Sequence, residues 1–184
     1  MLKLSSYAKS LNIRNMAVAL VAAIVFVMSA DPAYGCRRVG QFSFDEIFVA
    51  DAIVIATAEK YVGEPDLTII NFGVPDTQVV FKVDEVLKGD KVPATIVLNA
   101  YLSTVDDFND QDVPYKFVRP NGRGGTCLAN TYKKGASFLL FLKKTEHGYT
   151  SNISALGPSN EQLHDAQDPW LLWTREEIRK RSGK

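Results

Sequence analysis

Five short segments with strand-like apolar patterns constrain the fold of this 184-residue chain most strongly. The clearest covers residues 78–87, where Val79, Phe81 and Val83 alternate with polar neighbours, as expected for a half-buried strand. The alternation slips at residues 85–87, which indicates a bulge or sharp bend of the kind found in barrel strands. The other four segments are residues 52–62, 94–100, 137–144 and 149–155.

The spacing of these segments predicts how they connect. Residues 63–77 are polar and interrupted by proline, so they form a loop, and residues 145–148 close a hairpin with Gly148 at its tip. The stretch at residues 103–126 is acidic at first and then rich in proline and glycine, and it has no periodicity. Five strands with one long connection before the fourth predict a mainly β fold, a five-stranded barrel of the OB type.

Helical signals flank the barrel. Residues 42–48 suggest a short helical turn that packs aromatic rings. Residues 159–162 after Pro158 spell a capping box for a short helix. Asp168 and Pro169 then begin a C-terminal helix, as cap and first-turn residue. Two tryptophans one turn apart in this helix are more often core residues than a ligand platform, so the helix is expected to lie across the barrel.

The first 35 residues have the pattern of a secretory signal peptide. A basic start precedes 13 consecutive apolar residues, 16–28, which are fewer than a membrane-spanning helix needs. Small residues before Cys36 predict cleavage there, with cleavage after Ala30 as the alternative. The domains expected are therefore a signal peptide at 1–35, a barrel at 36–157 and a helical segment at 158–184 packed on it. Membrane attachment is expected only if the leader stays uncleaved or Cys36 carries a lipid.

Charge and cysteine content narrow the class of protein further. The mature part keeps 18 basic and 20 acidic residues, a net charge of −2 that argues against a nucleic-acid partner. An exported protein meets an oxidising compartment, periplasmic or extracellular, where an even pair of cysteines is expected to join. Cys36 and Cys127 are the only two, so they are predicted to form a disulfide, with buried free thiols as the alternative.

Catalytic patterns are weak, so no enzyme and no cofactor are expected. His147 falls in the hairpin turn and His164 in the predicted capped helix, and neither belongs to a metal-ligand pair or a triad. The glycines of residues 122–125 lack the lysine and following helix of a P-loop and read as a flexible turn. A hydrolase or metal enzyme in an unfamiliar arrangement stays an alternative.

One acidic cluster resembles part of a calcium loop. Its candidate ligands are Asp107, Asn109, Asp110 and Asp112. Asp107 and Asn109 match the opening of an EF-hand, but the turn glycine and the closing glutamate are missing. A solvated acidic loop is the simpler interpretation. Asn152 begins a glycosylation sequon that falls inside a predicted strand, where it is expected to be inert.

Order and spacing across residues 36–155 resemble bacterial relatives of the netrin-like, or tissue-inhibitor-of-metalloproteinases-like (TIMP-like), OB-fold superfamily. The blocks that carry the resemblance are Cys36 after the leader, Ala50-Asp51-Ala52-Ile53-Val54, residues 80–90 (VFKVDEVLKGD), Gly125-Thr126-Cys127 and Lys134-Gly135 followed by Phe138-Leu139-Leu140-Phe141. The resemblance implies the same barrel. It also implies that Cys127 pairs with Cys36, whereas Arg38 replaces the second cysteine of the family pattern.

Two functions follow from this resemblance. In the inhibitors, the α-amine and carbonyl of a mature N-terminal cysteine chelate the zinc of a peptidase, which Cys36 could do only as an unmodified first residue. Nothing else here resembles the peptidase-binding ridge. The expected function is therefore a binding module that recognises a protein or cell-envelope component through the loops at 103–126 and 63–77.

Overall fold

The computed structural model describes residues 42–65, 67, 75–124, 127–152 and 156–183. The chain divides into two compact units, Met1–Ala33 and Tyr34–Lys184, and all described residues belong to the second. The predicted signal peptide, its cleavage site and Cys36 therefore lie outside the described residues.

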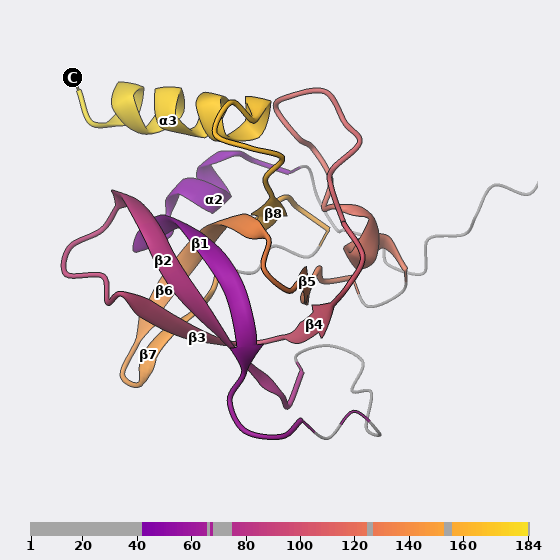
Figure 1. The fold of residues 1–184 in the computed structure, drawn as a ribbon. Helices are drawn as coiled ribbons and strands as arrows, with labels where there is room; N and C mark the ends of the chain where they lie inside the picture. The colour runs from indigo at the N-terminus through magenta and orange to yellow at the C-terminus, as the bar shows by residue number, and fades with distance from the viewer. Residues whose placement is uncertain (1–41, 66, 68–74, 125–126, 153–155, 184) are drawn as a thin grey trace, which may run out of the picture. The chain divides into compact units, whose positions relative to one another are not determined.

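The second unit is a mainly β fold built on a nearly closed antiparallel barrel (Figure 1). Its strands are β1 (Ala52–Tyr61), β2 (Gln78–Lys88), β3 (Thr95–Asn99), β6 (Ser137–Thr145) and β7 (Gly148–Ser151). They pair in the order β3-β2-β1-β6-β7, and the two outer strands, β3 and β7, approach each other to close the ring. This architecture confirms the predicted five-stranded barrel of the OB type.

The predicted irregularity in the second strand is confirmed by its register against β1. Ile53 pairs with Lys88 and Val54 with Val86, so Leu87 is an extra residue on β2. A second shift, between the pairs of Ile55 and Ala56, leaves out Asp84. Extra residues of this kind bend a strand, and the bend helps β2 to curve round the barrel.

The start of β1, residues 52–54, and residues 138–142 of β6 are buried on both faces, which explains their continuous apolar sequences. Their inward side chains, such as Val54 and Leu140, belong to the core inside the barrel. Their outward side chains, Ile53, Leu139 and Phe141, belong to a second core under the two helices.

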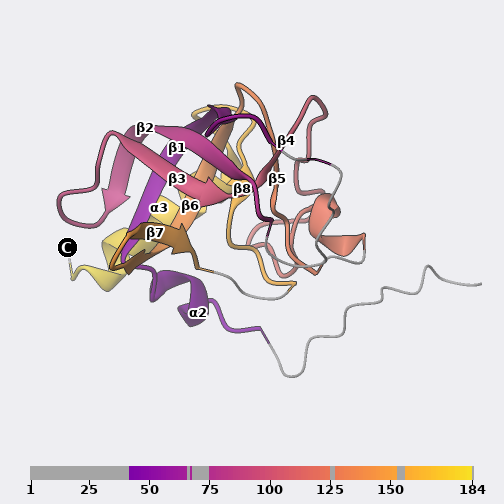
Figure 2. The ribbon, with the colours of Figure 1, turned by 90° about the horizontal axis from the view of Figure 1, so that it is seen from below.

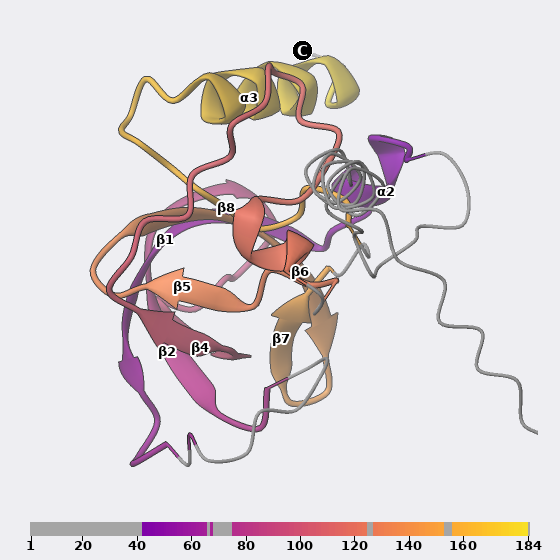
Figure 3. The same cartoon turned by 90° about the vertical axis from the view of Figure 1, so that its right-hand side faces the viewer.

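The two helices lie on that outer core. The first, α2 (Asp45–Phe48), is short, and Lys88 Nζ donates to the carbonyls of Phe48 and Ala50 at its end, at 2.8 and 2.7 Å. The second, α3 (Pro169–Arg181), begins as predicted, because the Asp168 side chain accepts hydrogen bonds from Trp170 N and Leu171 N. Trp170 is fully buried, which confirms it as a core residue. Figure 3 shows α3 lying across one end of the barrel.

Short strands and a 3-10 helix form in segments whose sequence has no periodic apolar pattern. Strands β4 (Tyr101–Ser103) and β5 (Thr131–Lys133) pair in parallel beside the barrel (Figure 2), and η1 (Pro120–Arg123) is a 3-10 helix. The prediction of a helix at residues 159–162 is wrong. Glu161 and Gln162 form strand β8, which pairs with Leu139 and Phe138 of β6. The capping-box sequence expresses only a local preference for a helix, and the hydrogen bonds of this segment to β6 outweigh that preference.

Candidate functional site

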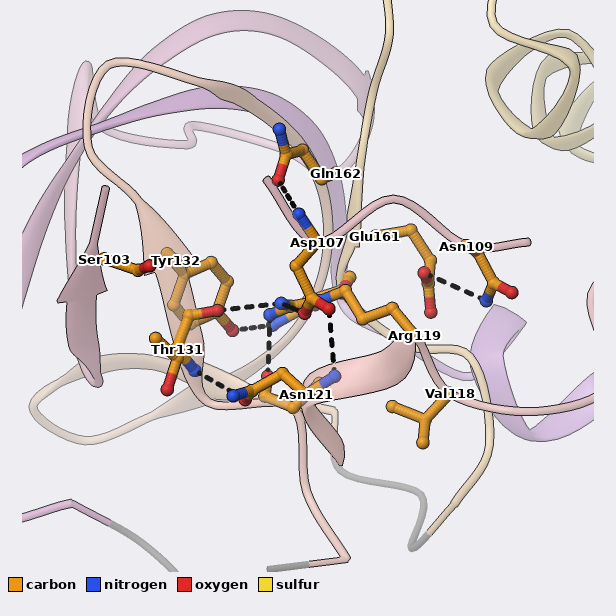
Figure 4. A network of polar contacts seen from close by, with 12 residues as sticks. Ser103, Asp107, Asn109, Val118, Arg119, Asn121, Thr131, Tyr132, Glu161 and Gln162 are labelled. Carbon is orange, nitrogen blue, oxygen red and sulfur yellow. Dashed lines mark hydrogen bonds and ion pairs between the residues drawn. The ribbon is translucent and has the colours of Figure 1, made fainter. Parts of the chain in front are cut away.

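A network of buried polar side chains joins the long connection, residues 103–126, to the barrel. At its centre lies Arg119, whose side chain is completely buried (Figure 4). Its guanidinium carbon lies over the rings of Tyr132 and Phe138, 4.9 and 5.5 Å from their centroids, where it adds cation–π attraction. Arg119 therefore packs against aromatic side chains of the barrel core.

The donors of Arg119 are satisfied by one carboxylate and three carbonyls. Nη1 donates to Asp107 Oδ2 and to the Thr131 carbonyl, the latter at 2.7 Å. Nε donates to the Asn160 carbonyl at 2.8 Å, and Nη2 to the Ala129 carbonyl at 2.9 Å. A buried cation is stable only with such partners, so this single side chain fixes the connection to β5 and to the segment before β8.

Asp107 is the anion of this network. Its Oδ1 accepts from Asn121 N at 2.9 Å, and its own backbone N–H donates to Gln162 Oε1 at 2.8 Å. The carboxylate that was predicted as the first ligand of a calcium loop is thus engaged by Arg119 and by η1.

The other calcium candidates also point elsewhere. Asn109 Nδ2 donates to the Phe117 carbonyl and to Glu161 Oε2, at 2.9 and 3.2 Å. Asp110 forms an ion pair with Arg123 at 2.8 Å, and Asp112 is exposed. Among the described residues no group of three or more acidic, histidine or cysteine side chains could hold a metal ion. The structure does not assemble the four candidates into a cation site.

Glu161 is the most unusual ionisable group of the site. It lies on β8, its side chain is fully buried, and its Oε1 has no hydrogen-bond partner within the described part of the chain. Burial raises the pKa of Glu161 to about 8, with Asp107 adding to the rise, although Arg119 and the hydrogen bond from Asn109 oppose it. Glu161 is therefore mostly a neutral carboxylic acid at neutral pH.

Asn160, next to Glu161, ties three more strands together. Its Nδ2 donates to Tyr132 Oη and to Ser151 Oγ, both at 2.9 Å, and its Oδ1 accepts from Phe141 N at 2.9 Å. The amide thus connects β5, β7 and β6 at the point where the long connection meets the barrel.

The outer surface of the same connection carries exposed apolar side chains. The side chains of Val105 and Phe117 are 69% and 59% exposed, although hydrogen bonds hold the backbone at both residues. Gln111 binds both backbone groups of Phe117, accepting from its N–H at 3.2 Å and donating to its carbonyl at 3.1 Å.

Tyr115 connects the inner side of the same connection to α3. Its ring stacks on Trp170 with the ring centroids 4.7 Å apart. Burial, followed by the charges of Asp168 and Glu161, raises the pKa of Tyr115 to about 12.

The two histidines occupy different environments. His147 lies in the exposed turn between β6 and β7, as predicted. His164 was expected in a helix, which is wrong, since it follows β8 outside any helix. Its ring stacks on Phe108 at 3.9 Å, and its Nδ1 lies 2.9 Å from Asp168 Oδ2. The buried carboxylate orients the half-exposed imidazole and at the same time caps α3.

The structure locates two further predicted features, whereas two others fall on residues that it does not describe. Gly122 is buried against Val118, so the predicted glycine turn is a packed 3-10 turn at that residue. The Asn152 side chain donates to the carbonyl of Glu46 at 2.8 Å, which engages the amide of the sequon. The pairing of Cys127 with Cys36 stays a prediction, because Cys36 is not among the described residues. Most of the loop at 63–77 also lies outside them.

No protein-family model matches the sequence, and a search of curated proteins finds no match. In the described part of the chain, no helix is both long and apolar enough to cross a membrane.

The sequence did not reveal Arg119 and Glu161 as site residues. The sequence alone does not distinguish a buried arginine from an exposed one, and Arg119 lies in a stretch without periodicity. The one available signal was the excess of acids at residues 106–112, because any carboxylate of this cluster that becomes buried needs a cation or hydrogen-bond donors.

Proposed function

We propose that this protein is an exported binding module that recognises a protein or cell-envelope component through the long connection at residues 103–126. The observation that carries the proposal is the fixed presentation of exposed apolar side chains by a segment without regular structure. The buried network behind the segment supplies the rigidity, and the outward side chains supply the contact surface.

Rigidity matters because ordering a loop on binding consumes interaction free energy. Arg119 and Asp107 already hold the inner side of the connection, and Gln111 holds the backbone at Phe117. A large aromatic side chain presented in this way is the kind of residue that dominates binding energy in protein interfaces. In OB barrels the loop between the first two strands, here residues 63–77, also belongs to the recognition surface.

Membership of the netrin-like superfamily belongs to the same proposal. The barrel order and the resemblance of residues 80–90 support it. Inhibition of a zinc peptidase would require Cys36 as a free mature N-terminus, which is a separate prediction that N-terminal mass spectrometry of the exported protein tests.

A capture experiment with surface variants tests the binding proposal. The bait proteins are the wild type, Phe117→Ser, Val105→Ser and the control Val97→Ser, whose side chain is 41% exposed on β3, away from both predicted recognition loops. Each is exposed to envelope extract, and captured components are quantified by mass spectrometry. We expect at least one component that the wild type and the control bind alike to lose about tenfold or more of its binding to the Phe117 variant. Identical capture by all four proteins would overturn the proposal.

A further inference from the structure

The long connection meets β8 through a carboxyl group that is poorly placed to carry a charge. Glu161 Oε2 accepts from the neutral amide of Asn109 at 3.2 Å, and a hydrogen bond with the Arg119 backbone also favours the charged form, while Oε1 has no hydrogen-bond partner among the described residues. An ionised carboxylate in a protein interior needs several donors or a cation of its own.

The nearest cation is already engaged. Arg119 directs Nη1 to Asp107 and its remaining bonds to main-chain carbonyls. The Asp107 carboxylate adds a negative charge near Glu161, and Tyr115 from the same connection is the third titratable group that interacts with it. The charge of Arg119 and two hydrogen bonds favour the ionised form of Glu161, but complete burial and the charge of Asp107 outweigh them and favour the neutral form.

Two backbone hydrogen bonds next to this carboxyl hold the connection in place. Asp107 N donates to Gln162 Oε1 at 2.8 Å, one residue along β8 from Glu161. Val118 N donates to the Leu156 carbonyl at 2.9 Å, one residue before Arg119. Water can reach an ionised Glu161 only if this interface opens, and opening would break these bonds.

We propose that Glu161 is a proton-controlled latch: its neutral form keeps the long connection docked on the barrel, and loss of its proton to solvent releases the connection. This inference rests on the proposed function, because it makes the shape of the proposed binding surface depend on pH. The surface is then complete in acidic and neutral surroundings and is loosened in alkaline ones.

The direct test is an NMR titration of the purified full chain labelled with carboxyl-¹³C glutamate, from about pH 5 to about pH 10. We expect the Glu161 carbon to titrate near pH 8 instead of in the ordinary carboxyl range. In the same samples, exchange protection of the Asp107 and Val118 amides should fall by up to about tenfold per pH unit as pH rises toward that midpoint, and it should level off above it. Protection of the Asp51 amide, which bonds the Leu142 carbonyl at 2.7 Å, should stay unchanged.

Two variants separate the latch from a general effect of alkali. Glu161→Gln should keep the protection of both amides across the range, whereas the exposed control Glu64→Gln should behave as the wild type. A Glu161 midpoint in the ordinary range, or equal loss of protection in Glu161→Gln, would overturn the proposal. If Glu161→Gln does not fold, the wild type alone provides the test. The midpoint of the Glu161 carboxyl titration must then coincide with the pH at which amide protection levels off, and a difference between the two excludes the latch. No partner is needed, so failure of the capture experiment leaves this result independent.

Discussion

Arg119 shows how one side chain can organise a segment that has no regular structure of its own. Its burial removes it from water, and the energy of that step is recovered only because Asp107 and three carbonyls surround it. The connection thereby acquires a fixed path without an α-helix or a long strand, and its described residues include only the short 3-10 helix η1 as a helical element. The same arrangement makes the path sensitive to the loss of either charge.

We expect Arg119→Ala to lower the free energy of unfolding by about 3–5 kcal/mol, because it leaves Asp107 without its cation and the carbonyls without donors. Urea denaturation followed by tryptophan fluorescence measures this change. The control is Arg175→Ala, which removes a half-exposed pair with Glu85 and should cost less than about 1 kcal/mol. Equal losses in the two variants would contradict the buried network.

Glu161 predicts a pH dependence of global stability with a definite sign. Burial raises the pKa of Glu161 from its ordinary value of 4.5 to about 8 in the folded protein, so the folded state binds the extra proton between these limits. The stabilisation by this group is complete below about pH 4.5 and is lost as pH rises through about 8, with a slope approaching about 1.4 kcal/mol per pH unit. Denaturation curves at several pH values should show this fall in the wild type. They should show a flatter profile in Glu161→Gln, and parallel profiles would exclude a buried neutral acid.

At the scale of elements, the block at residues 80–90 has a structural explanation. Lys88 caps α2, and Gly89 has a φ of +113° next to β1. A Cβ on Gly89 would lie 3.0 Å from both Ala52 Cβ and the Asp51 carbonyl oxygen. The Lys-Gly pair therefore joins the end of β2 to the start of β1, which is a requirement of the barrel and not of a ligand.

Gly89→Ala should accordingly destabilise the protein by about 1–3 kcal/mol, through both the backbone conformation and the close contact. Gly63→Ala is the matched control, since Gly63 also has a positive φ, +77°, but nothing lies within 4 Å of its Cβ position. Thermal unfolding of both variants measures the difference. We expect a larger drop in melting temperature for Gly89→Ala, and the reverse order would show that strain alone decides.

The elements that could be predicted are those whose apolar pattern is local. Alternation along β2 and two-sided apolarity along β6 located the barrel strands, and the cap at Asp168 located α3. Strand β8 could not be found in this way, because its two residues are polar and depend on β6 for their hydrogen bonds. Its buried acid is an exception to the rule that charged residues stay outside, so pattern reasoning assigned it to a helix cap.

For the molecule as a whole, the long connection was located as the candidate surface, but not the means by which it is held. Its role was inferred from length and composition, which are visible in the sequence. Its anchoring depends on contacts between Arg119, residues 129–131 and residue 160, which are remote in sequence and meet only in the folded barrel. Composition thus indicated where recognition could occur, and tertiary structure supplied the rigidity.

The predicted disulfide acts at this largest scale. Cys127 has a positive φ of 60° and follows the long connection, and its carbonyl accepts from Leu156 N at 3.1 Å. A bridge to Cys36 would close a loop of about 90 residues and stabilise the fold by about 4–5 kcal/mol in the chain-entropy model. Cys127→Ser and Cys36→Ser should each lower the free energy of unfolding by that amount, and reduction of the wild type should lower it equally.

Mass spectrometry, under non-reducing conditions, of the protein recovered from cells that express the full chain distinguishes the alternatives for Cys36. A bridged chain gains two hydrogens on reduction and then reacts with two equivalents of a thiol reagent, whereas a lipidated Cys36 adds the mass of its acyl groups and leaves one thiol. A bridge without a stability loss on reduction would mean that the barrel core and the Arg119 network alone determine the fold. A loss of about 4–5 kcal/mol would agree with the chain-entropy model, in which the bridge stabilises the fold by restricting the unfolded chain.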